Sequence, residues 1–406
     1  MARGRGGFIG QDGLNAPDSP TAVSATAGNA QASVAFTAPT DVGGSAITGF
    51  RAQSNPSGIG VSGSSSPITV AGLSNGTSYT FNVWAINAFG FSAPSDASSG
   101  VTPALADRAI FAGGLDTNTS AFVNTLQYVT VTSTGNTQDF GDLTESTNNT
   151  MGLSSSTRGV RGGGGISSGR TNVMDYVTIA SSGNAQDFGD LSSPSFTGAG
   201  TSNETRGLFA IGRAELTYVN TTEYITIAST GNTTDFGDRT VAAAFSEGAV
   251  ASTTRAVFAL GFIGSPVNDY QNVIDYFTIS STGNATDFGD ATVARYGCGA
   301  GNSSTRGIWS GGVNASSALD ITEYITIAST GNATDFGDLS TGRHQTSGAS
   351  NLTRCLIGGG RLANNNATDI ISYFTISSTG NDTDFGDLAV GVFGLTAFSN
   401  AHGGLS

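Results

Sequence analysis

The sequence contains no lysine. Its 16 basic residues are all arginines, they face 30 acidic residues, and the formal net charge is −14. Proteins that bind nucleic acid neutralise phosphates with clustered lysine and arginine, and no such cluster occurs here. The composition therefore excludes a nucleic-acid partner. The short basic start with Arg3 and Arg5 is too small to change this, although it could dock on an acidic partner.

Cysteine and histidine are also scarce, with two residues of each. Cys298 and Cys355 lack the paired spacing of a disulfide framework or a zinc site, so we expect both to be buried as small apolar residues. His344 and His402 are too few for repeated metal sites, and no serine lies in a nucleophile-elbow motif. We therefore expect no catalytic residues, no metal site and no cofactor, and we predict that the protein is not an enzyme.

Long apolar runs are missing as well. No segment approaches the roughly 18 apolar residues that a membrane helix needs. The start "MARGRGGFIGQDGLNAP" lacks the apolar core of a signal peptide. We expect a soluble chain that is made in the cytoplasm, does not insert into membranes, and reaches any surface role through assembly.

What is present is glycine, serine, threonine and asparagine, with 59 glycines in 406 residues. Glycine and β-branched residues interrupt nearly every window in which a helical period could be sought. Such a composition is typical of many short strands joined by tight turns. The predicted fold class is all-β.

Residues 16–103 contain alternating runs separated by turn signals such as Asn75-Gly76. In "YTFNVWAINAFGFSAPS" the alternation places Tyr79, Phe81, Val83 and Ala85 on one face. Leu73, six residues before Tyr79, completes the arrangement known as a tyrosine corner. On these residues the segment resembles a fibronectin type III domain. That resemblance implies a β-sandwich that acts as a spacer or adhesive module, and residues 1–15 before it are predicted to be a docking arm.

From residue 104 onward the chain repeats. The glycine that opens each GNxxDFGD copy lies at position 135, 183, 231, 283, 331 or 380. A strand-rich period near 50 residues is typical of propeller blades, and the double glycines followed by tyrosine resemble the kelch family. The kelch tryptophan is missing, so the resemblance is to a kelch-like repeat. For 104–406 we predict a six-bladed β-propeller.

Each period can be divided into four strands, with the small-residue strand innermost. The first copy begins with "RAIFAGG" and has no small-residue strand before it, whereas the last copy ends with the unpaired "VGVFGLTAFSNA". Pairing of these two ends would close the ring and remove exposed sheet edges. We therefore expect the C-terminal strand to complete the first blade.

The twelve aspartates of the DFGD copies can be read in two ways. Calcium accepts oxygen ligands in loops, but each copy offers at most two carboxylates, fewer than a dedicated calcium loop. The favoured interpretation is structural: Phe336 and its equivalents pack between blades, Asp335 points to the other face, and Asp338 follows Gly337 at a turn. In this interpretation the aspartate side chains hold turn N–H groups, and "STGN" is a tight hairpin. Calcium remains the alternative.

Comparison of the six copies with one another separates two sides of each blade. The "STGN" and "SS-TRG" turns hardly vary, whereas the connections on the opposite side differ in every copy. Loops on a rigid scaffold are where recognition usually occurs. The alternative is that these loops are merely unconstrained. The candidate ligand-binding residues on this variable side are Phe122, Tyr218, Asn268, Tyr270, Asn364 and Asp369.

Taken as a whole, the chain resembles a virion structural protein of a tailed bacteriophage, of the marine cyanophage type. The resemblance implies a non-enzymatic tail, fibre or capsid-associated protein, present in several copies in an assembly with other virion proteins. We expect the arm to dock through Arg3, Arg5, Phe8 and Ile9, and the propeller to bind a host-surface glycan or protein. The alternatives are a purely structural capsid decoration protein and a glycan-cleaving propeller.

Overall fold

A computed structural model describes residues 15–104, 106–214, 217–245, 248–264 and 266–405. The chain divides into two compact units, Met1–Ala106 and Asp107–Ser406. Every regular element described is a β-strand, apart from one short 3-10 helix, η2, at Gly403–Leu405. The protein is all-β.

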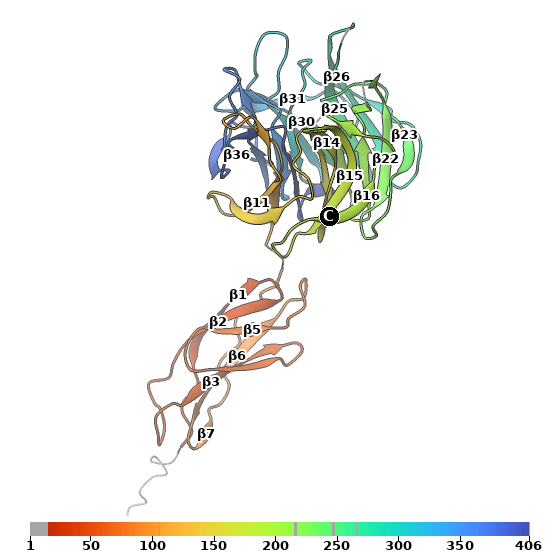
Figure 1. The fold of residues 1–406 in the computed structure, drawn as a ribbon. Coiled ribbons are helices and arrows are strands. Elements are labelled where there is room, and N and C mark those ends of the chain that lie inside the picture. The colour runs from red at the N-terminus through yellow and green to blue at the C-terminus, as the bar shows by residue number, and fades with distance from the viewer. Residues whose placement is uncertain (1–14, 105, 215–216, 246–247, 265, 406) are drawn as a thin grey trace, which may run out of the picture. The chain divides into compact units, whose positions relative to one another are not determined.

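The first unit is a sandwich of two antiparallel sheets, ordered β1-β2-β5 and β4-β3-β6-β7 (Figure 1). Its strands are β1 (Thr21–Gly28), β2 (Gln31–Thr37), β3 (Gly49–Asn55), β4 (Gly60–Gly63), β5 (Ile68–Ala71), β6 (Thr80–Asn87) and β7 (Gly90–Phe91). Alternate residues of β6 are buried, as the period of two in the sequence predicts.

The expected tyrosine corner is present in this unit. Leu73 and Tyr79 are both buried, and the Tyr79 hydroxyl accepts the backbone N–H of Ser74 at 3.1 Å. This bond lowers the pKa of Tyr79, because it favours the charged form of the phenol. The bond ties the loop before β6 to the strand and so fixes the end of the sandwich.

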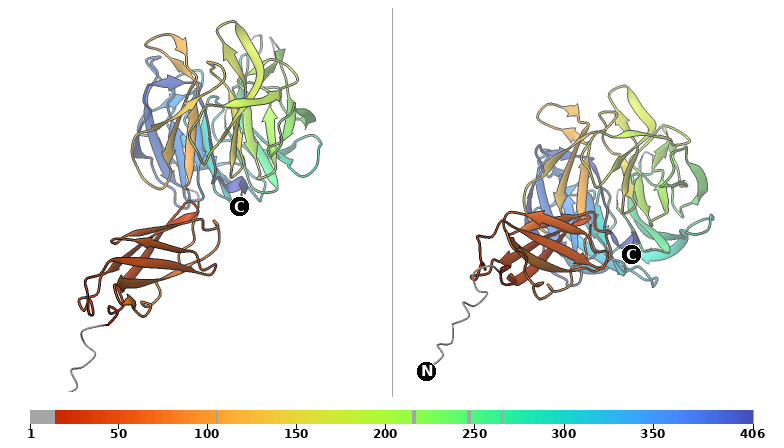
Figure 2. Two further views of the ribbon diagram at one scale, coloured as in Figure 1. Left: turned by 60° about the horizontal axis from the view of Figure 1, so that its bottom comes forward. Right: turned by 90° about the horizontal axis from the view of Figure 1, so that it is seen from below.

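The main body of the second unit is formed by six four-stranded antiparallel sheets in the part of the chain that the structure describes (Figures 1 and 2). Their first strands are β39 (Thr396–Ser399), β13 (Met151–Ser154), β18 (Ala199–Ser202), β24 (Ala249–Ala251), β28 (Gly299–Asn302) and β33 (Ser347–Ser350). The second strands are β8 (Arg108–Ala112), β14 (Arg158–Ile166), β19 (Arg206–Ala210), β25 (Arg255–Ile263), β29 (Arg306–Ser310) and β34 (Arg354–Gly358).

The third strands are β11 (Thr125–Thr130), β15 (Gly169–Thr178), β22 (Thr221–Thr226), β26 (Asp269–Thr278), β30 (Ile321–Thr326) and β36 (Ile370–Thr375). The fourth strands carry the DFGD copies and are β12 (Gln138–Asp142), β16 (Gln186–Asp190), β23 (Thr234–Asp238), β27 (Thr286–Asp290), β31 (Thr334–Asp338) and β37 (Thr383–Asp387). We call this second unit, Asp107–Ser406, the six-sheet unit.

The six first strands contact one another in cyclic order, from β39 through β13, β18, β24, β28 and β33 back to β39. Strand β39 pairs with β8, so the first sheet is built from both ends of this unit. Small residues such as Gly200 and Gly348 permit the crowding. A side chain on Gly348 would lie 2.1 Å from the carbonyl oxygen of Ala300 in the next first strand. The first strands are therefore the inner strands of the unit.

The DFGD phenylalanines are buried between sheets, as expected, with Phe140 and Phe336 at 2% and 1% exposure. Each ring packs edge-on against the tyrosine of its own third strand, at 5.7–6.0 Å between ring centroids. Over each tyrosine lies the guanidinium of the first arginine of the second strand, at 4.2–4.6 Å. Repeated Arg–Tyr–Phe stacks thus fill the space between neighbouring sheets.

These arginines also join each sheet to the next one. Arg158, for example, donates from Nη1 to the carbonyl oxygen of Ile227 at 2.8 Å. The last arginine of the series, Arg354, donates in the same way to Val131 of the first sheet at 3.1 Å. The link therefore recurs around the whole unit and includes the contact between its last and first sheets.

The DFGD motif itself forms a β-bulge. In the sixth sheet Ile371 pairs with Gly386 and Ser372 with Asp384, which leaves Phe385 as the extra residue. The same register shift occurs in the other five sheets. The expectation that Gly337 and Asp338 form a turn was therefore wrong, because both lie within β31.

The bulge receives the Gly-Asn of the following copy. The glycine N–H donates to the phenylalanine carbonyl, as from Gly183 to Phe140 at 2.7 Å. The asparagine Oδ1 accepts the N–H of the second aspartate, at 3.1 Å in all six copies. The expectation that the aspartate side chains accept turn N–H groups was therefore wrong. The backbone N–H of the second aspartate donates the bond, and the side-chain oxygen of the turn asparagine accepts it. The "STGN" segment joins sheets and is not a tight two-residue hairpin.

Candidate functional site

Each sheet of the six-sheet unit has two ends that differ in sequence. Antiparallel pairing places the "SS-TRG" and "STGN" turns at one end, which we call the turn end. The connections between second and third strands, and those that lead into the next inner strand, lie at the other end, which we call the loop end. The connecting loops that differ in sequence from one repeat to the next therefore all lie at the loop end.

Small accessory sheets cover parts of the loop end. Three of them consist of β9 (Leu115–Asp116), β10 (Ala121–Phe122) and β38 (Val392–Phe393); β17 (Ser195–Phe196), β20 (Arg213–Ala214) and β21 (Thr217–Tyr218); and β32 (Arg343–His344) and β35 (Arg361–Leu362). Each pairs a loop of one sheet with the connection that precedes an inner strand. The loops are therefore held by backbone hydrogen bonds.

A pair of glycines directs the β14–β15 hairpin into this layer. Gly163 has a φ of +62°, and the pairing of β14 with β15 shifts register between Gly162 and Gly164. A side chain at Gly163 would lie 2.7 Å from the carbonyl oxygen of Ser195. Glycine is required here because the backbone is left-handed and because the neighbouring connection packs directly on it.

The axis of the unit is closed at the loop end by a cycle of backbone hydrogen bonds. Each of six residues donates its N–H to the carbonyl of the preceding one, with distances of 2.5–3.1 Å. All six have left-handed φ values, from 50° to 75°. They are Asn149, Thr197, Phe245, Gly297, Gln345 and Gly394.

The C-terminal residues occupy the axis at the turn end. A nitrogen of His402, Nε2, lies 3.1 Å from the carbonyl oxygen of Ser154, and a side chain on Gly404 would lie 2.1 Å from that of Ser202. Between the two closures the inner strands line a cavity of about 60 Å³, room for very few water molecules. The axis therefore offers no space for a ligand larger than water.

A larger pocket, of about 610 Å³, opens at the loop end. It lies where the loops of the first two sheets meet the connection to the third. We call it the Phe122–Phe196 pocket, and it is lined by Phe122, Asn148, Asn149, Gly165, Gly169, Arg170, Pro194 and Phe196. These lining residues include two aromatic rings, two carboxamides and one guanidinium, and no carboxylate.

The polar groups of this pocket differ in how they are held. Asn148 is 8% exposed, and its backbone pairs in both directions with Gly165. Its carboxamide has no hydrogen-bond partner among the described residues. The carboxamide of Asn149, by contrast, accepts a bond from Gln345 Nε2 at 3.1 Å. The guanidinium of Arg170 lies over the Phe196 ring, 4.5 Å from its centroid.

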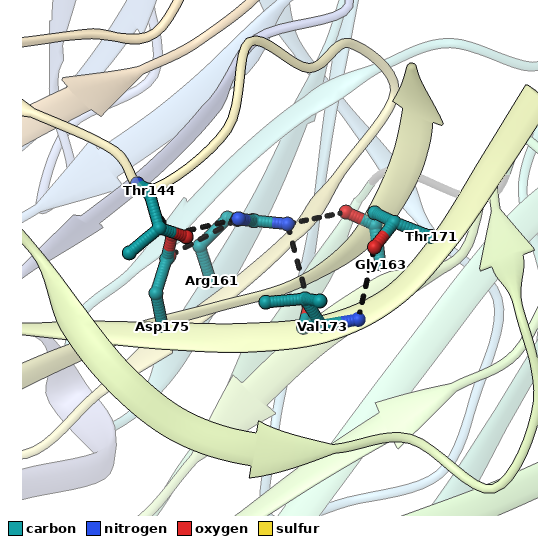
Figure 3. Close-up of polar contacts among 6 residues, drawn as sticks. All are labelled: Thr144, Arg161, Gly163, Thr171, Val173 and Asp175. Atoms are coloured by element: carbon teal, nitrogen blue, oxygen red, sulfur yellow. Dashed lines mark hydrogen bonds and ion pairs between the residues drawn. The ribbon is translucent and has the colours of Figure 1, made fainter. Parts of the chain in front are cut away.

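A buried ion pair supports the wall that carries Arg170 (Figure 3). Arg161 makes two parallel bonds to Asp175, at 3.1 and 2.7 Å, and its remaining donors reach the carbonyls of Gly163 and Val173. Thr144 of the preceding sheet donates to the same carboxylate from both its N–H and its hydroxyl. Such a satisfied bidentate pair fixes the two strands of the hairpin in place.

A cluster of aromatic side chains lies at the loop end of the fourth and fifth sheets. The rings of Tyr270 and Tyr296 stack at 5.8 Å with an interplanar angle of 19°. Phe262 contacts both of them, and Phe245 packs on Tyr296 at 5.1 Å. Next to Tyr296 is His344, whose Nδ1 is buried and has no hydrogen-bond partner within the described part of the chain. Burial, with the Arg361 cation as a further cause, lowers the pKa of His344 to about 4.

The six predicted ligand-binding residues all lie at the loop end, but the structure does not bring them together. Phe122 lines the pocket and Tyr270 belongs to the aromatic cluster. Tyr218 is half-buried, and the guanidinium of Arg213 lies over its ring, 5.4 Å from the ring centroid. Asn268 is exposed in the loop between β25 and β26, and Asn364 and Asp369 are exposed in the one loop between β35 and β36, where the Asn364 side chain accepts the N–H of Asn366. The predicted docking residues Arg3, Arg5, Phe8 and Ile9 lie outside the described residues.

Sequence reasoning missed Asn148, Arg170 and Phe196. They come from a connection, a hairpin and another connection, and neither their spacing nor their type marks them as partners. The double asparagine at 148–149 is the only local signal, and it cannot show that one carboxamide is engaged and the other is not. Only the packing of neighbouring sheets brings these side chains to Phe122.

No group of three or more histidine, cysteine, aspartate or glutamate side chains that could hold a metal ion occurs among the described residues. Both cysteines are buried, and neither forms a disulfide among the described residues. Burial raises the pKa of the Cys355 thiol to about 12. Within the same residues, no helix is long and apolar enough to cross a membrane.

Comparison with known proteins identifies the first unit. The family model of the fibronectin type III domain matches residues 17–101. Together with the two-sheet sandwich and its tyrosine corner, this shows that these residues form a fibronectin type III domain. No curated protein matches the chain.

Proposed function

We propose that the six-sheet unit is a six-bladed, kelch-like β-propeller, and that the chain is a non-enzymatic virion protein of a tailed bacteriophage. In this proposal the propeller presents its loop end to the host surface. The fibronectin type III domain acts as a spacer, and residues 1–15 dock the chain on other virion proteins. Several copies are present in the assembled particle.

The cyclic contacts of the inner strands support the propeller. Three kinds of link recur in all six sheets: the asparagine-to-aspartate bond, the arginine-to-carbonyl bond and the backbone cycle around the axis. Each includes the contact between the last and first sheets. A ring closed in this way leaves only short sheet edges, which the neighbouring sheets protect.

One observation carries the proposed recognition role. The turn end repeats one set of contacts six times, whereas the loop end contains a different surface over each sheet and a pocket in which the Asn148 carboxamide has no hydrogen-bond partner among the described residues. Rigid scaffolds with individual loops are typical of binding proteins. The pocket lining offers rings, amides and a guanidinium, groups that hold a ligand, and it lacks the carboxylate pair that glycoside hydrolysis uses.

Binding of the full chain to arrayed bacterial surface polysaccharides, and to intact cells, tests the function. Asn148→Trp fills the pocket at the loop end, and Thr230→Trp places the same ring on an exposed turn-end residue as the control. We expect the first variant to lose binding and the second to retain it. A purely structural decoration role would be favoured if Asn148→Trp retained binding while Thr230→Trp lost it. It would also be favoured if the folded chain bound no surface at all. Deletion of residues 1–15 should abolish incorporation into particles, and normal incorporation contradicts the docking role.

A further inference from the structure

We infer that the Phe122–Phe196 pocket binds a single pyranose residue of a polysaccharide. In this assignment the Asn148 carboxamide holds two sugar hydroxyls and the phenylalanine rings cover an apolar sugar face. This inference rests on the proposed host-surface function and names its ligand class.

The Asn148 side chain is the first step. A polar side chain on a residue that is only 8% exposed normally makes its hydrogen bonds within the protein. Asn148 has no such partner among the described residues, although its backbone is fixed on both sides by Gly165. Its carboxamide therefore leaves one donor group and one acceptor available at the pocket that Asn148 lines.

The pair of groups on one amide suits a sugar. Adjacent hydroxyls of a pyranose each donate and accept, so a planar amide can bond two of them at once. A carboxylate would only accept and a guanidinium would only donate. The amide therefore favours neutral hydroxyl groups over a charged ligand group as its partner.

The walls supply the apolar part of the match. Phe122 and Phe196 are both half-buried, and each leaves part of its ring to the pocket. The C–H groups of a pyranose form a flat apolar face that packs on an aromatic ring. Arg170 lines the pocket with its guanidinium over the Phe196 ring, which adds a cationic group to this wall. The glycines at 165 and 169 keep the opposite wall free of side chains.

The size of the pocket limits the ligand. Ligand pockets typically span about 300–1,000 Å³. A pocket of about 610 Å³ takes one sugar ring with room for part of a second. A chain of sugars would enter through one residue and run out over the loop end. We expect affinity for a single residue to be weak, with a Kd on the order of 1 mM.

Saturation-transfer NMR of the full chain with methyl glycosides of glucose, galactose, mannose, N-acetylglucosamine and glucuronic acid tests the inference. We expect at least one glycoside to receive saturation, mainly on the protons of one ring face. Asn148→Leu keeps the shape of the side chain and removes the amide. It should raise the Kd about tenfold or more, which corresponds to a loss of about 1.4 kcal/mol of binding free energy. Phe122→Ala should do the same, and it serves as the second variant should Asn148→Leu fail to fold.

Arg361→Gln is the matched control, because Arg361 also lies over an aromatic ring, that of Phe393, at the loop end but outside the pocket. It should leave the saturation unchanged. Absence of saturation for every glycoside, or saturation unaffected by Asn148→Leu and Phe122→Ala, would overturn the inference. Should the chain then still bind cells through the loop end in the array and cell experiment, the proposed function stands without the sugar pocket. Loss of both contradicts both.

Discussion

The side-chain oxygen of Asn136 accepts the backbone N–H of Asp387 at 3.1 Å, although the two residues are 251 positions apart. The same bond, at the same distance, joins Asn184 to Asp142 within the chain of consecutive sheets. The contact that joins the last sheet to the first is therefore equivalent to those between sheets that are adjacent in sequence.

The first prediction concerns this equivalence. Asn136→Ala and Asn184→Ala each remove one acceptor, so each should lower the free energy of unfolding by about 1 kcal/mol. Denaturant unfolding of the two variants should give the same loss within error. A negligible effect of Asn136→Ala beside a clear effect of Asn184→Ala would mean that the last and first sheets are not joined in solution.

The bulge glycine gives a second prediction. Gly141 has a φ of +145°, and a side chain there would lie 2.5 Å from the carbonyl oxygen of Gly183. A side chain added at Gly183, the other glycine of this contact, would meet no atom within 4 Å. We expect Gly141→Ala to destabilise by about 2 kcal/mol or more, and Gly183→Ala by clearly less. Equal losses in thermal unfolding would contradict the close backbone approach at the bulge.

A third prediction comes from a buried arginine without a carboxylate. Arg161, Arg239 and Arg295 are paired with Asp175, Asp275 and Glu323, each the residue before a third-strand tyrosine. In the sixth sheet that position is Ser372, whose hydroxyl accepts a bond from Arg343 at 3.1 Å. Burial lowers the pKa of Arg343 to about 10, and its Nε has no hydrogen-bond partner among the described residues.

Ser372→Glu should supply the missing partner and raise the free energy of unfolding by about 2 kcal/mol, because an unpaired buried charge is costly. The gain should vanish when Arg343→Met is combined with it. A destabilised Ser372→Glu protein, or a gain that persists without Arg343, would show that the guanidinium is already satisfied. Denaturant unfolding of the two single variants and the double variant provides the measurement.

The fourth prediction is a pH dependence. His344 lies opposite Arg361 in the pairing of β32 with β35, and its pKa falls from 6.5 to about 4. Between these values the unfolded chain binds a proton that the folded chain does not, so stability should fall as the pH decreases from 6.5 to 4. The contribution is at most about 3 kcal/mol.

His344→Gln should reduce the slope of the free energy of unfolding against pH between pH 4 and 6.5. Above pH 6.5 the pH dependence of this free energy should stay nearly unchanged. Part of the slope should remain, since burial also lowers the pKa of His402. An unchanged slope in His344→Gln, measured by denaturant unfolding between pH 4 and 7, would contradict the buried neutral state of His344.

The strand pattern could be predicted from the sequence because each copy repeats the same alternation. The burial of Phe336 and the four strands of each period follow from periodicity alone. The bulge at DFGD could not be predicted, since an alternating strand and a bulged one share the same residues. For the same reason the direction of the Asn–Asp bond was missed: both side chains could serve as acceptors, and only the geometry of two sheets decides between them.

The candidate site was predicted in part. Phe122 and Tyr270 could be chosen because they are aromatic residues in variable loops. Asn148, Arg170 and Phe196 could not, because their relation to Phe122 depends on the packing of consecutive sheets. Asn268, Asn364 and Asp369 met the same criterion as Phe122 but are exposed in two other loops, with Asn364 and Asp369 in the same one. Loop position predicts exposure, and convergence on one pocket requires the structure.

Hydrogen exchange of the full chain, with and without a surface polysaccharide that it binds, tests most directly whether the loop end is the recognition surface. We predict slower exchange on binding for residues 148–149, 165–170 and 194–196, and unchanged exchange in the six "STGN" turns. Protection confined to the turns, with none at the loop end, would contradict this assignment of the two ends.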